Sequence, residues 1–385
     1  MKSDKIKLAI ASCGLGNVNR GFEVSAARWY QALCHEPRLN VKLFCGGKYP
    51  GGTVVGNCPR NSFVTTLLRQ LDLIHDGCRL EQISFAYSFL PYLIRWQPDV
   101  IWTQEYTLAH FFNRLREKFK LQYKIIFCDG APVGPNSYQE FDFIQHLTSR
   151  SYDDGKQFGI SATKMQVLPH CTPDKKPTES RPRLREAFGY TNEDWVVVCV
   201  AAWNCHHKRI DYLIEEVAAL EDPQVKLLLC GQPEAETLSL KTLGSQKLGG
   251  SIQWRTLPAH EVNRALYLAD AFVLPSLSEG LPGALIEAAM AGLPIVSHRY
   301  SGAEFILQSD FWMTDLSQAG SLTQRLAQLK NNPANTEKIK QLQTQAIERF
   351  SDRALAPQFY EMVKKLSKSN EQCNDKSSRH LHSHV

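Results

Sequence analysis

Short apolar runs alternate with amphipathic segments along most of this chain. The runs are four to seven residues long and rich in Val, Ile and Leu, which is typical of buried parallel strands. They lie at Leu8–Ser12, Val41–Cys45, Val100–Thr103, Lys124–Cys128, Trp195–Ala201, Val225–Cys230, Ser251–Trp254, Ala271–Leu274 and Pro294–Ser297. Segments with helical spacing separate them, for example Glu23–Cys34, Tyr212–Leu220 and Ala284–Ala291. The alternation predicts an α/β fold with helices on both faces of doubly wound, Rossmann-like sheets.

A break rich in proline divides this pattern into two halves. Pro173, Pro177 and Pro182 crowd together there, which is typical of a linker between domains. The parts we expect are an N-terminal domain (1–172), a linker (173–185), a C-terminal domain (186–350), a helix that packs back on the N-terminal domain (351–367) and a disordered polar tail (368–385). Two such domains enclose a cleft at the carboxyl ends of their strands, where open α/β sheets bind ligands.

Composition supports two globular domains. The chain has 385 residues, 43% hydrophobic and 22% charged, and a domain takes about 100–200 residues. Residues 1–170 carry 20 Lys/Arg and 14 Asp/Glu (20 − 14 = +6), whereas the remainder carries 24 and 25 (24 − 25 = −1). The basic half fits an anionic partner such as a lipid headgroup or a phosphorylated substrate, although chance asymmetry on a solvated surface explains it equally well. Because it lacks a dense Lys/Arg run, we expect no nucleic-acid partner.

The eleven cysteines form no CxxC pair and have no regular spacing. Cys128, Cys199 and Cys230 lie inside strand-like runs, so we expect reduced, buried thiols in a cytoplasmic protein.

The stretch Ile83–Trp96 is apolar and aromatic but shorter than the ~20 residues that span a bilayer. Together with the basic first half, it suggests peripheral contact with the inner face of a membrane. The alternative is a partly buried helix of the first domain.

The most specific motif is the segment from Ser276 to Val296, which contains SEGLPGALIEAAMAGLP. It follows a predicted strand, turns through Gly and Pro, and begins a helix near Ala284. A helix N-terminus presents unpaired N–H groups and a partial positive charge, so a diphosphate can bind there. Glu279 precedes the turn and Glu287 follows eight residues later, so one carboxylate can approach a sugar while the other accepts two ribose hydroxyls.

This segment closely resembles the donor-binding motif of the retaining glycosyltransferases of family 4, which have the two-domain GT-B fold. Trp195–Ala201, followed by His206–Ile214, resembles the family's strand, loop and KxxxxLI helix start, and Leu227–Gly231 resembles its strand ending in glycine. The resemblance is strong from about Trp195 to Leu307 and weaker over the rest of the chain.

The resemblance implies a role for each matching residue. Lys208 corresponds to the lysine that binds the donor pyrophosphate, Glu287 to the ligand of the ribose diol, and Glu279 to the carboxylate placed against the transferred sugar. The remaining donor-binding positions it implies are Arg209 beside the lysine, Leu257 near the base, and Gly280, Leu281 and Gly283 around the phosphates. Pro282 has no N–H to contribute to them.

Two positions depart from the family pattern. Trp203 stands where the family usually has an arginine that contacts the pyrophosphate, so His206, His207 or Arg209 has to compensate. Asp129 follows the predicted strand Lys124–Cys128, and many members of the family have a histidine at the end of the corresponding strand. Asp129 either orients an acceptor hydroxyl, as a catalytic residue, or caps the next turn.

The loop Gly14–Glu23 joins the first strand to the first helix. It fails as a nicotinamide fingerprint because Asn19 occupies a required glycine position. It matches the family's glycine-rich first loop, in which Gly16 approaches the donor phosphate. A tight turn that needs glycine without any ligand is the alternative.

The expected function is transfer of a sugar from a nucleotide-sugar donor to a glycan, lipid-linked or small-molecule acceptor, with retention at the anomeric carbon. The acceptor-side domain is then the N-terminal one. The resemblance implies no cofactor beyond the donor substrate and no essential metal, which fits the lack of a DxD cluster beside the donor motif. Another GT-B activity such as nucleotide-sugar epimerisation, or a non-catalytic sugar-nucleotide-binding protein, is the alternative.

Overall fold

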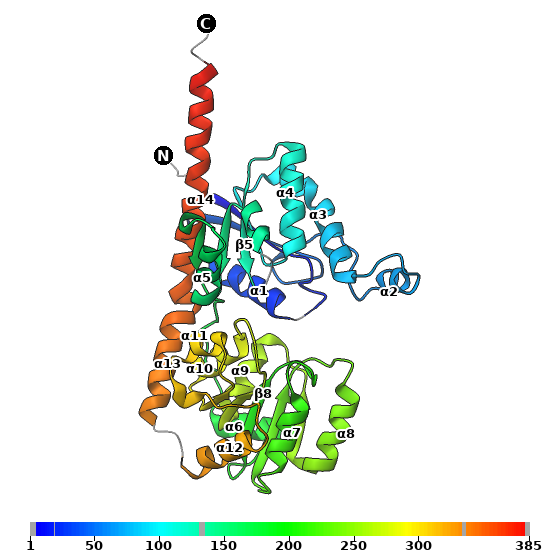
Figure 1. Cartoon of the computed structure of the whole chain (residues 1–385), viewed down its shortest axis with the longest axis vertical. Coiled ribbons are helices and arrows are strands. Elements are labelled where there is room, and N and C mark those ends of the chain that lie inside the picture. Colours follow the sequence, from blue (N-terminus) through cyan, green and yellow to red (C-terminus); the bar gives the residue numbers. More distant parts are fainter. Residues whose placement is uncertain (1–4, 19, 131–134, 333–335, 382–385) are drawn as a thin grey trace. The chain divides into compact units, whose positions relative to one another are not determined.

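The computed structural model describes residues 5–18, 20–130, 135–332 and 336–381. The chain divides into two units, and it passes between them twice. Unit 1 consists of residues 1–173 and 352–385, and unit 2 of residues 174–351. Each unit is built on one parallel sheet covered by helices (Figure 1).

Unit 1 has a seven-stranded sheet in the order β3-β2-β1-β4-β5-β6-β7, in which every neighbouring pair is parallel. Its strands are β1 (Ile6–Ser12), β2 (Leu39–Cys45), β3 (Gly52–Val54), β4 (Val100–Thr103), β5 (Lys124–Asp129), β6 (Phe143–His146) and β7 (Met165–Val167). Its helices are α1 (Gly21–Leu33), α2 (Phe63–Gln70), α3 (Gly77–Trp96), α4 (Tyr106–Phe119), α5 (Ser149–Gln157) and α14 (Asp352–Leu381), with the short 3-10 helices η1 (Pro135–Glu140) and η2 (Ala162–Lys164).

Unit 2 has a five-stranded parallel sheet in the order β10-β9-β8-β11-β12. Its strands are β8 (Trp195–Val200), β9 (Val225–Cys230), β10 (Ile252–Arg255), β11 (Ala271–Leu274) and β12 (Ile295–Ser297). Its helices are α6 (Arg181–Phe188), α7 (Ile210–Ala218), α8 (Thr237–Leu248), α9 (Ala259–Leu268), α10 (Gly283–Ala291), α11 (Ser301–Leu307), α12 (Ser321–Asn331) and α13 (Thr336–Phe350), with the 3-10 helices η3 (Gly249–Ser251) and η4 (Asp310–Trp312).

The doubly wound α/β prediction is therefore confirmed, and each expected strand lies within two residues of its predicted bounds. In both sheets the order reverses at one place, between β1 and β4 in unit 1 and between β8 and β11 in unit 2. Open α/β sheets bind ligands beside such a switch point, at the carboxyl ends of the strands. The expected burial of Cys128, Cys199 and Cys230 is also confirmed, since each is at most 1% exposed.

Two expected boundaries differ from the structure. Helix α6 begins at Arg181 inside the expected linker, because Pro182 lies in the first helical turn, where its missing N–H costs no hydrogen bond. Helix α14 continues to Leu381 through residues expected to be disordered, since no Gly or Pro interrupts them. Its earlier part packs on unit 1, where the rings of Phe359 and Trp29 are 4.5 Å apart.

The aromatic stretch Ile83–Trp96 lies within α3, on the core of unit 1. Phe85 and Phe89 are fully buried, and the Phe89 ring meets Phe44 edge-on at 4.5 Å. The stretch is thus a partly buried helix of unit 1, as the alternative expects, with Tyr87 54% exposed. Contact of this helix with a membrane stays a prediction. In the part of the chain that the structure describes, no helix has the length and hydrophobicity to span a bilayer.

Candidate donor-binding site

The sheet order of unit 2 brings the two strongest motifs together. Strands β8 and β11 are neighbours, with Val197 opposite Ala271, although more than 70 residues separate them in the sequence. Because both strands point the same way, the loop after β8 and the turn after β11 emerge side by side at the switch point. The first carries Lys208 and the second carries Glu279.

Lys208 and Glu279 form an ion pair between their side-chain ends. Both side chains are mostly buried, at 18% and 11% exposure. The Nε2 atom of His207 lies 3.6 Å from the other carboxylate oxygen of Glu279 and 3.3 Å from the Ser278 carbonyl oxygen. Of the two histidines in this loop, His207 is thus the one that contacts the Lys208–Glu279 pair, and its expected role in place of the missing arginine stays a prediction.

The conformation of the Lys208 loop depends on Asn204, a residue that the sequence analysis did not single out. Its side-chain oxygen accepts the Lys208 N–H at 2.7 Å and the His207 N–H at 3.2 Å. Its amide donates to Glu234 at 2.9 Å. Asparagine in a short polar loop is a usual sign of such a side-chain turn, and this signal was available in the sequence.

The donor turn leads from Glu279 directly into α10. Leu281 is 8% exposed, so its side chain belongs to the core and only its backbone can meet a ligand. Pro282 occupies the N-cap position without a capping side chain, and the first turn begins at Gly283. Glu287 lies one turn further along, is partly exposed, and has a partner within the chain. A nine-residue helix that starts beside a lysine suits an anionic group.

Leu257 and Arg209 differ in how well they fit their expected roles. Leu257 is partly exposed and follows β10, at the same carboxyl edge of the sheet as Lys208. The Arg209 guanidinium instead donates to the carbonyl oxygens of Pro275, at 3.2 Å, and Leu316, at 2.7 Å. It therefore ties loops of the edge together, and the expected contact with a diphosphate would require it to leave them.

Trp203 is 3% exposed and fills the core, where its ring meets Trp254 edge-on at 5.1 Å. His206 is largely exposed and contacts Glu236, away from Glu279. The position of the family's arginine is thus an apolar one in this chain, and His207 is the nearby residue that contacts the Lys208–Glu279 pair.

Gly302 supports the donor turn, and its role became visible only in three dimensions. A Cβ atom there would lie 2.2 Å from the Gly280 carbonyl oxygen and 3.1 Å from that of Glu279. Helix α11 and the donor turn are therefore packed backbone against backbone.

We expect Gly302→Ala to lower the melting temperature and weaken nucleotide binding, because the donor turn has to move. Overpacking of this kind costs typically about 1–3 kcal/mol. Gly250→Ala is the matched control, since nothing lies within 4 Å of its added Cβ. Thermal melts and nucleotide titrations of both variants test the expectation, which fails if Gly302→Ala behaves like Gly250→Ala.

In unit 1, Gly16 lies in the turn after β1 with a φ of +89°. A Cβ there would lie 2.4 Å from the carbonyl carbon of Gly47. The positive φ and the close approach of Gly47 are enough to explain why glycine is needed at this position, whether or not a ligand binds there. They favour the tight-turn alternative. The nearby Asn19 lies outside the described residues.

Asp129 ends β5 and is 8% exposed. Its Oδ2 accepts the Tyr138 hydroxyl at 2.8 Å and lies 3.1 Å from Nδ1 of the buried His146. Tyr138 belongs to η1, the 3-10 helix that follows, so the carboxylate ties η1 to β6 through side-chain contacts. Residues 131–134, in the turn after Asp129, lie outside the described residues, so capping of that turn stays a prediction, as does a role in orienting an acceptor.

The switch point of unit 1 contains buried carboxylates that the sequence analysis missed. Glu105, at the start of α4, accepts the Cys13 N–H at 2.9 Å and the Ser12 hydroxyl at 3.2 Å. Arg60 pairs with Glu81 at 2.5 Å and with Glu23 at 3.6 Å. Burial raises the pKa of Glu105 to about 7 and also raises the pKa of Glu23.

We expect Glu105 to make the stability of the chain fall as the pH rises from about 4.5 to 7. A carboxyl group with a raised pKa holds its proton more tightly in the folded chain, so its stabilisation is complete below pH ~4.5 and is lost as the pH passes through the folded pKa. At about 1.4 kcal/mol per pKa unit, the loss is up to about 3 kcal/mol.

Urea unfolding of wild type and Glu105→Gln on both sides of this range measures that loss, because the variant cannot titrate. Glu117→Gln, an exposed site on the same helix, is the control. Identical pH dependence of Glu105→Gln and wild type would contradict the assignment.

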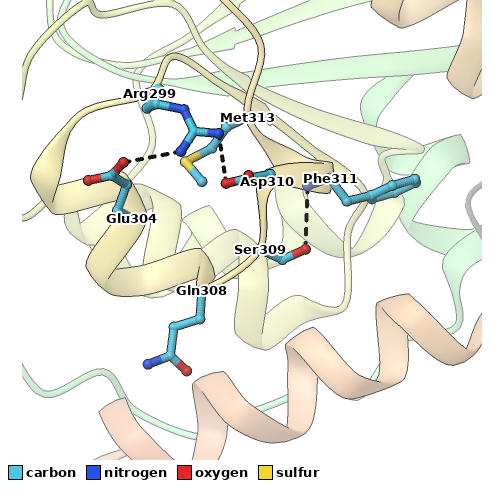
Figure 2. A pocket seen from close by; sticks show the side chains of 7 residues that line it. All are labelled: Arg299, Glu304, Gln308, Ser309, Asp310, Phe311 and Met313. Atoms are coloured by element: carbon cyan, nitrogen blue, oxygen red, sulfur yellow. Dashed lines mark hydrogen bonds and ion pairs between the residues drawn. The ribbon is translucent and has the colours of Figure 1, made fainter.

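A cavity of about 510 Å³ lies elsewhere on unit 2, beside α11 and η4. Figure 2 shows Arg299 between Glu304 and Asp310, with nitrogen–oxygen distances of 3.2 and 2.7 Å. Because the single cation among its lining residues is already shared by two carboxylates, this cavity does not suit a diphosphate. The described residues also contain no group of three His, Cys, Asp or Glu side chains that could hold a metal ion.

Part of unit 2 matches a known protein family. Residues 180–349 match the family of Glycosyl transferases group 1, and this stretch contains every candidate donor-binding residue of unit 2. WcaL of Escherichia coli (strain K12), which is named for a glycosyltransferase role in colanic acid biosynthesis, is 41% identical over 78 residues. The match covers 18% of this chain and 19% of WcaL, so the chain spans about a fifth of that relative.

Solved structures resemble nearly the whole chain. Sucrose-phosphate synthase from Thermosynechococcus elongatus superposes with a TM-score of 0.77 at 16% identity, over 95% of this chain and 100% of its own. Anabaena HepE, in complex with UDP and glucose, gives 0.71 at 16% identity, over 93% and 99%. Identities this low show the fold alone. The expected GT-B fold is confirmed.

Proposed function

We propose that this chain is a retaining glycosyltransferase of family 4 that moves a hexosyl group from a nucleotide-sugar to a glycan, lipid-linked or small-molecule acceptor. The observation that carries the proposal is the meeting of Lys208 and Glu279 at the switch point of unit 2, directly before the N-terminus of α10. The match of residues 180–349 to the group 1 glycosyltransferases supports it.

In the proposed reaction, the bond between the anomeric carbon and the diphosphate oxygen breaks, and negative charge grows on the leaving diphosphate. Lys208 and the N–H groups at the start of α10 stabilise that charge, which is an electrostatic task. Glu287 binds the ribose, and Leu257 lies near the base. The acceptor hydroxyl attacks from the face that the diphosphate leaves and gives its proton to the departing diphosphate oxygen, so no pair of carboxylates as in a glycoside hydrolase is needed.

Binding of the donor requires Lys208 to exchange partners. Its ammonium group forms an ion pair with Glu279, and a diphosphate competes with that carboxylate. Glu279 then faces the transferred sugar, with His207 beside it. The pair thus positions both groups before the donor arrives.

Because HepE binds UDP and glucose, UDP-sugars are the first donors to test. We expect release of UDP only when an acceptor is added, without a metal requirement and so without loss of activity in EDTA. The anomeric configuration of the product, read by NMR, tests retention. Binding without release would favour the non-catalytic alternative, for which the apolar position of Trp203 is the relevant observation.

A further inference from the structure

Gln104 is a buried residue whose amide group lacks hydrogen bonds. It follows β4 at the carboxyl edge of the sheet of unit 1, beside the switch point between β1 and β4. The residue is 3% exposed, and neither Oε1 nor Nε2 makes a hydrogen bond within the part of the chain that the structure describes. The Cys128 thiol contacts the amide but is a weak partner. Because folded proteins satisfy most buried polar groups, an unpaired amide at an edge that binds ligands points to a ligand.

A second buried glutamine in the same sheet has a satisfied amide. Gln145 on β6 is fully buried, its Oε1 accepts the Trp102 indole N–H at 2.7 Å, and its Nε2 donates to the Leu168 carbonyl oxygen at 2.7 Å. The two glutamines are similarly buried, but the fold fills the hydrogen bonds of Gln145 alone. Burial of an unpaired amide is unfavourable because the group gives up its water. Gln104 therefore lowers the stability of the chain when no ligand is bound.

Gly130 and Phe22 lie beside the Gln104 amide. A Cβ atom on Gly130 would lie 2.8 Å from Nε2 of Gln104 and 2.7 Å from Cε1 of Phe22. Gly130 is not one of the glycines with a positive φ, so its backbone conformation does not itself require glycine. The absence of a side chain instead lets the amide and the Phe22 ring lie against it. Phe22, in the first turn of α1, is partly exposed, and rotation of such a side chain is fast, so turning this ring uncovers the amide.

We propose that the Gln104 amide recognises two neighbouring hydroxyl groups on the sugar of a glycan acceptor, an inference that rests on the proposed function. An amide presents an N–H donor and a carbonyl acceptor side by side, and a pair of hydroxyl groups accepts from the first and donates to the second. The Phe22 ring suits the apolar C–H face of the same sugar.

Other kinds of acceptor group fit this position less well. Glu105 directly follows Gln104 and Asp129 directly precedes Gly130, so an anionic group here would meet two acidic side chains. An apolar group would leave both amide atoms unpaired, as they are in the free chain. A neutral sugar has neither disadvantage, which narrows the acceptor to a glycan with adjacent free hydroxyl groups.

The variant Gln104→Met separates a ligand contact from a structural role. Methionine has a similar length but forms neither hydrogen bond. We expect the melting temperature of this variant to equal or exceed that of wild type, because no hydrogen bond within the chain is lost. Gln145→Met is the matched control and should melt at least about 2 °C lower, since it leaves the Trp102 N–H and the Leu168 carbonyl group unpaired.

Binding of an acceptor sugar is measured without donor, by NMR titration with methyl β-D-galactopyranoside and methyl β-D-glucopyranoside. We expect wild type and Gln145→Met to bind at least one of these glycosides, and Gln104→Met to bind it about tenfold more weakly, since two neutral hydrogen bonds are lost. In turnover assays the KM for the acceptor should rise by a similar factor, while the affinity for UDP stays unchanged.

Two results would overturn the inference. One is a melting temperature of Gln104→Met that falls as far as that of Gln145→Met, because the amide is then satisfied within the folded chain. The other is equal binding of the glycosides by wild type and Gln104→Met, or binding by neither. Both measurements proceed without turnover, so their failure is distinct from failure of the proposed function, which is contradicted if wild type releases no UDP with any acceptor.

Discussion

Replacing Lys208 by alanine should lower kcat about 10²–10³-fold, the usual cost of losing a group that stabilises developing charge. Charge on the departing diphosphate is larger in the transition state than in the bound donor, so kcat should fall more than donor affinity. Trp203 is in the core and Arg209 is bound to two carbonyl groups, so Lys208 has little support apart from His207.

Lys330→Ala is the matched control for this variant. Lys330 forms a comparable ion pair in the same unit, with Asp222, and is 21% exposed where Lys208 is 18% exposed. Removing either lysine breaks one ion pair with a carboxylate, so the two variants should lose similar stability while only one loses turnover. A folded Lys208→Ala chain that keeps most of its kcat would show that the diphosphate is held elsewhere.

Replacing Glu287 by alanine should weaken binding of the nucleoside diphosphate about ten- to a hundredfold. A hydrogen bond to a charged group is worth about 1.5–3 kcal/mol, and the ribose offers two hydroxyls to this carboxylate. Because Glu287 is only partly buried, the fold should survive. Isothermal titration with UDP measures the change.

Glu348→Ala, at an exposed position on α13, is the control for this variant. Circular dichroism of both variants distinguishes a lost ligand contact from a lost contact within the chain, since Glu287 also has a partner there. Unchanged affinity of a folded Glu287→Ala chain would remove Glu287 from the site.

The sequence alone predicted the elements whose signal is local. Apolar runs such as Val225–Cys230 became strands at the same residues, because a strand buried on both faces needs continuous apolar side chains. The strands that were missed carry weaker signals. Strand β6 contains Gln145 and His146, both fully buried, and Gln145 is tolerated there because Trp102 and the Leu168 carbonyl group satisfy its amide.

The sequence also determined the candidate donor motif, because a strand, a Gly/Pro turn and a helix with two spaced glutamates all lie within one short segment. Only the tertiary structure decided which side chains meet there. It placed Lys208 and His207 beside Glu279, tied Arg209 to two carbonyl groups, and buried Gln104 at the carboxyl edge of the sheet of unit 1. These outcomes depend on strand order and on packing between distant segments. The local pattern of apolar residues does not reveal strand order or long-range packing. It shows only which side of each element is apolar, and not what lies against that side.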